Sequence, residues 1–222
     1  MKTSELYDRY ILKSEKNSTN DGISTDRQRF VELYNEWQIR FLEYYYDLKN
    51  EDDFRYIESL LILDHKIKDS KKSREFYSFE LPNNYFDLSS VYALGSKGNC
   101  KNKKIDLLIE VNDINKDIYL SDENTKPSFE YRESIYTVAS KNVNVYYDDF
   151  HIDSLILSYY RYPKKLRLQN PDNPESDFDD SFDIDFDDKS INRIISATVG
   201  GFDVNNKSDR WQLNNNFSKK DL

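Results

Sequence analysis

The spacing of apolar residues changes along the chain, and this change restricts the fold more than any other feature. Between Phe30 and Leu48, apolar side chains recur at steps of three and four residues, which predicts a helix with one broad apolar face. Over about residues 75–163 they alternate with polar side chains, which predicts strands. We therefore expect an α+β fold, with an N-terminal helical hairpin, a mostly antiparallel β-sheet in the middle and a C-terminal helix.

The predicted hairpin occupies about residues 25–68. Thr25 and Gln28 have the spacing of a capping box at the start of its first helix, and the polar residues 50–53 separate the two helices. The buried face of the second helix is expected at Phe54, Ile57, Leu60, Leu61 and Ile67, and its lysine-rich end at Lys66, Lys68, Lys71 and Lys72.

Trp37 and Phe41 lie one turn apart on the first predicted helix and are expected in its core. A Trp37→Ala change is then predicted to cost about 3–5 kcal/mol if the indole is fully buried.

About five or six strands are predicted, bounded by turn residues. The predicted extended segments are residues 76–81, 85–94, 105–111, 129–139, 143–147 and 154–160. Residues 113–127 are expected to be an irregular connection, and the last two segments are expected to form a hairpin with a longer loop at 148–153.

The C-terminal third is predicted to be irregular and acidic before a last helix. Asp187 or Asp188 is expected to cap that helix, over about residues 188–202, and Gly200-Gly201 to interrupt or end it. Trp211 and Phe217 suggest a short further helix. The predicted domain plan is an arm over residues 1–24, a single domain over 25–205, and a tail over 206–222.

Composition narrows the classes of function. The net charge of -9 argues against a protein that wraps DNA or lies on an anionic membrane, although an acidic wall suits a passage through which DNA slides. Cys100 is the only cysteine and is expected to be a half-buried turn residue, so no intrachain disulfide can form. The sequence contains no apolar run long enough to span a membrane. We expect no secretory signal in residues 1–9, and we expect the protein to be assembled in a reducing cytoplasm.

No catalytic motif stands out, and we expect neither an enzyme nor a cofactor. His65 and His151 are expected at the surface, and Gly-rich phosphate loops are absent from the sequence. Asp183, Asp185 and Asp187 alternate as at the start of a calcium loop, but the Gly and distal Glu of that loop are missing. An unrecognised hydrolase would need a carboxylate pair, for which the candidates are Glu110, Asp122, Glu123, Glu130 and Glu133.

Two oppositely charged segments are candidate interaction surfaces. Residues 161–167 are basic, and residues 177–188 are acidic with phenylalanines that we expect to be exposed. The basic segment could touch a phosphate backbone, but we expect it to pair with the acidic segment of a neighbouring subunit. If so, reversing Asp179, Asp180 and Asp183 to Lys should leave a folded chain that fails to assemble. If the acidic segment instead folds back on its own sheet, the reversal should unfold the chain.

Three phrases resemble those of the head-to-tail connector proteins of short-tailed bacteriophages, the adaptor or tail-tubular family. They are Leu81-Pro82-Asn83-Asn84-Tyr85-Phe86, Tyr159-Tyr160-Arg161-Tyr162-Pro163 and Asp187-Asp188-Lys189-Ser190-Ile191-Asn192-Arg193-Ile194-Ile195. Three further segments, residues 29–36, 50–57 and 126–133, are similar more narrowly to ring proteins of crAss-like phages. The resemblance covers roughly residues 25–215, and the composition, rich in residues that AT-rich genomes encode, agrees with it.

The resemblance implies a structural virion protein in the tail or connector, without catalytic or metal-binding residues. It implies a ring of about twelve copies that contacts the portal protein and other ring or tail-hub proteins. DNA would pass through the lumen without sequence-specific binding, and no membrane would be involved. The alternative is an acidic phage-encoded binding protein that inhibits a host enzyme.

Overall fold

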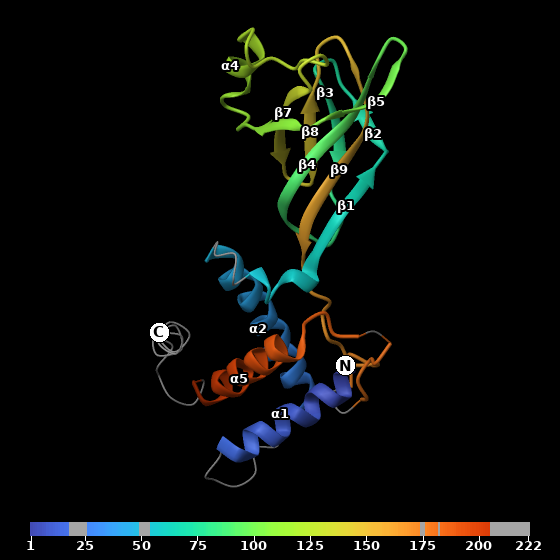
Figure 1. The fold of residues 1–222 in the computed structure, drawn as a ribbon. Coiled ribbons are helices and arrows are strands. Elements are labelled where there is room, and N and C mark those ends of the chain that lie inside the picture. The colour runs from blue at the N-terminus through green and yellow to red at the C-terminus, as the bar shows by residue number, and fades with distance from the viewer. Residues whose placement is uncertain (18–25, 49–53, 174–175, 182, 205–222) are drawn as a thin grey trace. The chain divides into compact units, whose positions relative to one another are not determined.

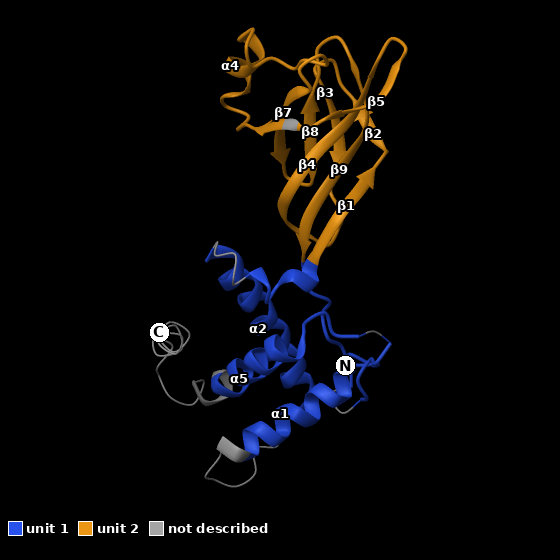
Figure 2. Ribbon diagram, viewed as in Figure 1, with its two compact units in different colours: residues 1–60, 162–222 blue, residues 61–161 orange. Residues whose placement is uncertain are grey.

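The chain divides into two compact units in the computed structural model, which describes residues 1–17, 26–48, 54–173, 176–181 and 183–204. Unit 1 combines residues 1–60 with residues 162–222, and unit 2 is the continuous segment 61–161 between them (Figure 2). The boundaries therefore fall inside the single domain predicted over residues 25–205, where the chain enters and leaves its β region.

Unit 1 is built from three long helices, α1 (Thr3–Asn17), α2 (Arg27–Asp47) and α5 (Asp188–Val204) (Figure 1). Helix α5 packs on both α1 and α2. The rings of Tyr10 and Phe30 lie 4.9 Å apart between centroids and join α1 to α2. The side chains that close this core are large and fully buried: Leu6, Tyr10, Phe30, Tyr34, Leu42, Ile191, Ile194 and Ile195.

Capping residues fix where two of these helices begin. Asp26 caps α2 by accepting a hydrogen bond from the amide of Gln28, and Thr25 lies outside the described residues. Asp187 caps α5 by accepting from the amide of Ser190 at 2.7 Å, which confirms one of the two predicted caps. Helix α5 continues through Gly200-Gly201 to Val204, so the predicted interruption there is wrong.

Unit 2 is a pair of sheets with a core between them. One sheet has the order β1-β9-β4-β5 and the other the order β2-β3-β8-β7-β6. Only the β6–β7 pair is parallel among these described strands, so the predicted α+β fold with a mostly antiparallel β region is confirmed. The strands are β1 (Leu61–Ile67), β2 (Ser70–Lys72), β3 (Phe76–Glu80), β4 (Tyr85–Lys97), β5 (Cys100–Ile105), β6 (Leu107–Glu110), β7 (Glu133–Ala139), β8 (Asn142–Tyr146) and β9 (His151–Arg161).

The helix predicted to reach residue 68 is wrong, because the chain leaves the helical state before unit 2 begins. A single turn of 3-10 helix (Glu58–Leu60) leads directly into β1, which pairs antiparallel with β9. The local pattern of apolar residues fits a helix, but pairing with a central strand outweighs it. At the N-terminus, residues expected to form an arm instead form α1, so the two N-terminal helices are α1 and α2.

The predicted hairpin between residues 143 and 160 is also wrong. Strand β8 belongs to one sheet and β9 to the other, so residues 147–150 connect the two sheets. Residues 154–160 are buried without interruption, a pattern typical of a central strand covered on both faces rather than of a hairpin arm. The strands predicted at 76–81, 85–94 and 129–139 are present as β3, β4 and β7.

The two aromatic residues predicted in the core of the first helix differ in burial. Phe41 is buried as expected, whereas Trp37 is only half-buried, with the Arg40 guanidinium 5.0 Å from its ring centroid.

The connection 113–127 contains the short helix α4 (Lys116–Ser121). The helix predicted near Trp211 and Phe217 lies outside the described residues.

Candidate functional site

The acidic and basic segments of the sequence meet each other inside unit 1. Arg167 Nε lies 3.0 Å from Asp179 Oδ2, and Lys164 Nζ lies 3.6 Å from Asp185 Oδ1. The backbone amide of Lys164 also donates to Asp185 Oδ2 at 2.7 Å. The prediction that these segments pair between neighbouring subunits is therefore wrong, since each finds its partner in the same chain.

Backbone pairing brings the two segments into register. The amide of Asp179 donates to the carbonyl of Arg167 at 3.0 Å, and the amide of Gln169 donates to the carbonyl of Asp177 at 2.8 Å. Leu168 and Phe178 face each other between these bonds as an isolated antiparallel bridge. The charges are thus placed side by side by backbone geometry, and the ion pairs add to a contact that the main chain already makes.

Helix α2 holds the basic segment through two amide side chains. Asn35 donates from Nδ2 to the Leu166 carbonyl at 2.9 Å and accepts from the Leu166 amide at 2.8 Å, as a neighbouring strand would. Gln38 donates to the carbonyl of Lys164 at 3.2 Å and is itself buried. These bonds satisfy backbone groups that would otherwise be unpaired in an irregular segment.

The phenylalanines of the acidic segment are buried rather than exposed. Phe178 is 6% exposed, and its ring centroid lies 5.1 Å from that of Tyr7 on α1. Phe186 is 5% exposed and packs edge-on against Phe41 of α2. Phe182, which the sequence grouped with them, lies outside the described residues. The acidic segment therefore folds back on the helices of its own unit.

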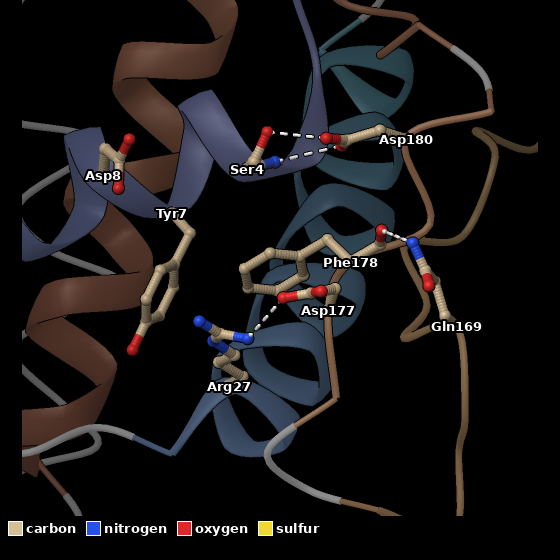
Figure 3. Close-up of a pocket in the computed structure, with 8 residues that line it drawn as sticks. All are labelled: Ser4, Tyr7, Asp8, Arg27, Gln169, Asp177, Phe178 and Asp180. Atoms are coloured by element: carbon tan, nitrogen blue, oxygen red, sulfur yellow. Dashed lines mark hydrogen bonds and ion pairs between the residues drawn. The ribbon is translucent and has the colours of Figure 1, made fainter.

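A pocket of about 430 Å³ opens where this segment crosses α1 and the start of α2 (Figure 3). Its polar walls are two bonded pairs. Ser4 donates to the Asp180 carboxylate through its hydroxyl at 2.6 Å and its amide at 3.1 Å, and Arg27 lies 3.1 Å from Asp177 Oδ1. The lining residues are Ser4, Tyr7, Asp8, Arg27, Gln169, Asp177, Phe178 and Asp180.

This pocket lacks an activated nucleophile among the residues that line it. Burial raises the pKa of Asp180, but hydrogen bonds from Ser4 and the Thr3 backbone, together with the Lys2 charge, outweigh it, and the pKa lies below its usual value. A carboxylate stabilised in this way is a poor general base near neutral pH, and no histidine or lysine lines the pocket to activate the Ser4 hydroxyl. The bonded pairs stabilise the fold around Phe178.

The other candidate residues for chemistry are dispersed. His65 lies in β1 and His151 at the start of β9, and both are exposed, as predicted. Cys100 is exposed at the start of β5, so the prediction that it is half-buried is wrong. The described part of the chain holds no group of three histidine, cysteine or carboxylate side chains that could bind a metal ion.

The carboxylates that alternate before α5 each have a separate partner. Asp183 pairs with the N-terminal ammonium group at 3.3 Å, Asp185 with Lys164, and Asp187 caps α5. Among the carboxylates considered for a catalytic pair, Glu110 accepts from the Tyr136 hydroxyl at 3.0 Å and Glu130 pairs with Lys97 at 2.8 Å. These side chains are engaged in structural contacts with different partners.

Unit 2 carries two further groups of charged residues, which the sequence analysis did not propose as interaction surfaces. Its residues 68–74 are exposed and mostly basic, and exposed carboxylates gather around α4 together with two exposed isoleucines, Ile114 and Ile118. Both groups are visible in the sequence. The lysines were attributed to the end of a predicted helix, and the acids to a featureless connection.

Comparison with known proteins does not extend this list of functional residues. No protein-family model matches the chain, and no curated protein matches its sequence. Across the described ranges, no helix is both long and apolar enough to cross a lipid bilayer.

Proposed function

We propose that this protein is a structural component of a phage particle, one subunit of a ring in the connector between portal and tail. The observation that carries the proposal is where the three phrases resembling connector proteins lie in the fold. Residues 81–86 form the turn from β3 into β4, and residues 159–163 form the end of β9, where the chain leaves unit 2. Residues 187–195 supply the cap and first turns of α5.

Each phrase thus lies at the end or the start of a helix or strand, and residues 159–163 also span the boundary between unit 2 and unit 1. In the family that these phrases resemble, N-terminal helices are followed by a β region and a C-terminal helix, and the same order of elements is found here. In that family the first phrase opens the β region, whereas here β1, β2 and β3 precede residues 81–86.

The charge of the protein is compatible with this role. A net charge of -9 disfavours tight binding to DNA and suits a wall past which DNA moves without sticking. In the proposed assembly, about twelve copies form the ring, one face meets the portal protein or the ring above, and the other meets the next ring or the tail hub.

Purified virions test the proposal directly. The protein should be present at a fixed ratio to the portal protein in quantitative mass spectrometry of particles banded by density, and imaging of those particles should place it at the portal–tail junction. The ratio of the tail-hub protein to the portal serves as the internal control. Absence from clean virions, together with abundance in infected cells, would overturn the proposal and favour the acidic inhibitor of a host enzyme.

A further inference from the structure

The two end strands of the second sheet of unit 2 continue into segments of opposite charge. In the order β2-β3-β8-β7-β6, strand β2 forms one end and β6 the other. We call residues 68–74 the basic end; they contain four cationic side chains and one carboxylate. We call residues 107–123 the acidic end; they contain five carboxylates and one lysine.

The basic end presents its charge to solvent. All of residues 68–74 are exposed, and Lys68, Lys71 and Arg74 lie within ion-pair distance of no carboxylate of the described chain. Lys72 instead lies over the rings of Tyr77 and Tyr147, at 5.4 and 5.2 Å from their centroids. Clustered cations repel one another, so this edge gains from an acidic partner.

The acidic end combines exposed carboxylates with apolar side chains, and the charge of Lys116 partly offsets that of Asp113 and Asp117. Asp113, Asp117 and Glu123 are exposed and form no ion pair with any described residue. Beside them, Ile114 is 90% exposed and Ile118 is 67% exposed. An exposed isoleucine alone needs no explanation, but a pair of them beside unpaired charge is typical of a docking surface.

The packing of α4 shows that Ile118, and Ile114 just before the helix, lie outside the core of unit 2. Tyr119 and Leu120 pack inward against the small core formed by Val111, Ile135 and Tyr146. Ile118, on the same short helix, stays outside that contact, and α4 has no buried residue. Tyr119 and Leu120 therefore anchor the helix, and Ile114 and Ile118 are left for something outside the chain's own core.

The two ends cannot neutralise each other within one molecule. Strands in a sheet lie about 4.8 Å apart, so four spacings separate β2 from β6 by about 19 Å. An ion pair requires a separation of about 4 Å or less. In Figure 1, α4 and β2 accordingly lie on opposite sides of unit 2.

We infer that the acidic end of one copy docks on the basic end of the next copy, so that the second sheet of unit 2 makes the head-to-tail contact of a ring. This inference rests on the proposed function and names its subunit interface. The occupant is a second copy of this chain because each chain carries both complementary surfaces, the requirement for a heterologous contact that repeats. A nucleic acid would satisfy the basic end alone and leave the acidic end and its isoleucines exposed.

The test uses two charge reversals in the full-length chain. The base-reversed variant carries Lys68→Glu, Lys71→Glu and Arg74→Glu, and the acid-reversed variant carries Asp113→Lys, Asp117→Lys and Glu123→Lys. A control with the same change in net charge as the acid-reversed variant carries Glu43→Lys, Asp47→Lys and Asp148→Lys, exposed carboxylates outside both ends. Circular dichroism and thermal melting confirm that each variant is folded before sedimentation velocity and native mass spectrometry at low salt.

Wild type and control should self-associate, and each reversed variant alone should associate at least about tenfold more weakly because like charges then face each other. Mixing the two reversed variants should restore association into alternating assemblies, since both contacts then join opposite charges. A wild-type chain that stays monomeric at its solubility limit, reversed variants that associate like the control, or a mixture that fails to recover would each overturn the inference.

The same variants separate this inference from the proposed function. If virions contain the protein and incorporate both reversed variants as well as the control, the contact is wrong while the ring role stands. If the mixture rescues association but virions lack the protein, the contact stands and the role in the particle is wrong.

Discussion

Two charged segments of unit 1 pair with each other, whereas two charged ends of unit 2 do not, although unit 2 also contains internal ion pairs such as Lys97–Glu130. In unit 1, Asp179 and Asp185 pair with Arg167 and Lys164 a short distance along the same chain. In unit 2, the cations of residues 68–74 and the carboxylates around α4 stand at opposite ends of one sheet. Charge that is paired internally supports a fold, whereas charge held apart by a rigid sheet is available to a partner. Composition alone does not distinguish these cases, because both units are rich in Asp and Lys.

The largest effect should come from removing one buried ring in each unit. Phe30 and Phe79 are fully buried, in unit 1 and unit 2 respectively, and Phe→Ala at either site should lower the free energy of unfolding by about 3–5 kcal/mol. Hydrogen exchange read by mass spectrometry should show faster exchange confined to the unit that carries the change. Equal loss of protection in both units would mean that they unfold as one body, which would break the comparison.

The charge reversal of Asp179, Asp180 and Asp183 to Lys now has a different expected result. These carboxylates bond to Arg167, to Ser4 and to the N-terminal ammonium group. Reversal places cations against Arg167 and the N-terminal ammonium group and removes the acceptor of Ser4, so it should lower the Tm of unit 1 by several degrees. The Glu43, Asp47 and Asp148 control should melt close to wild type. A triple variant with an unchanged Tm that is still excluded from particles would return these residues to a role between subunits.

A smaller effect is expected from Trp37, which the sequence placed in the core. The indole is half-buried under Arg40, so Trp37→Ala should cost only about 1–2 kcal/mol, well below the full value for a buried aromatic ring. Phe41→Ala, one turn further on and 6% exposed, is the matched comparison and should cost about 3–5 kcal/mol in urea unfolding. Equal costs at both sites would show that the face bearing Trp37 is covered.

The smallest effect concerns pH and the Ser4–Asp180 pair. Hydrogen bonds from Ser4 hold the pKa of Asp180 below its usual value despite burial, so this contact stabilises unit 1 above about pH 4 and is lost as pH falls through the lowered pKa. Ser4→Ala should raise the pKa of Asp180 in a carboxyl-carbon NMR titration and flatten the acid dependence of unit 1 stability. A pKa that does not move would assign the shift to other neighbours.

Much of the architecture could be predicted from the sequence because it depends on local pattern. The helical spacing after Phe30, the alternation in residues 76–81 and the cap at Asp187 each depend on residues close in sequence, and all three predictions are confirmed. The failures are equally instructive. Residues 61–67 carry apolar positions that suit a helix or a strand, and only the presence of β9 as a pairing partner decides between them.

For the candidate sites too, the sequence determined which charged segments exist, and the tertiary structure determined their partners. The sequence by itself determined that an acidic and a basic segment exist, that catalytic motifs are missing from it, and that the chain switches from helical to extended spacing. Only the tertiary structure decided that residues 161–167 form ion pairs with residues 177–188, while the charges of residues 68–74 and 107–123 lie at opposite ends of a sheet. The reason is physical: an ion pair requires contact within a few ångströms, and which side chains reach that distance depends on how distant strands and helices pack.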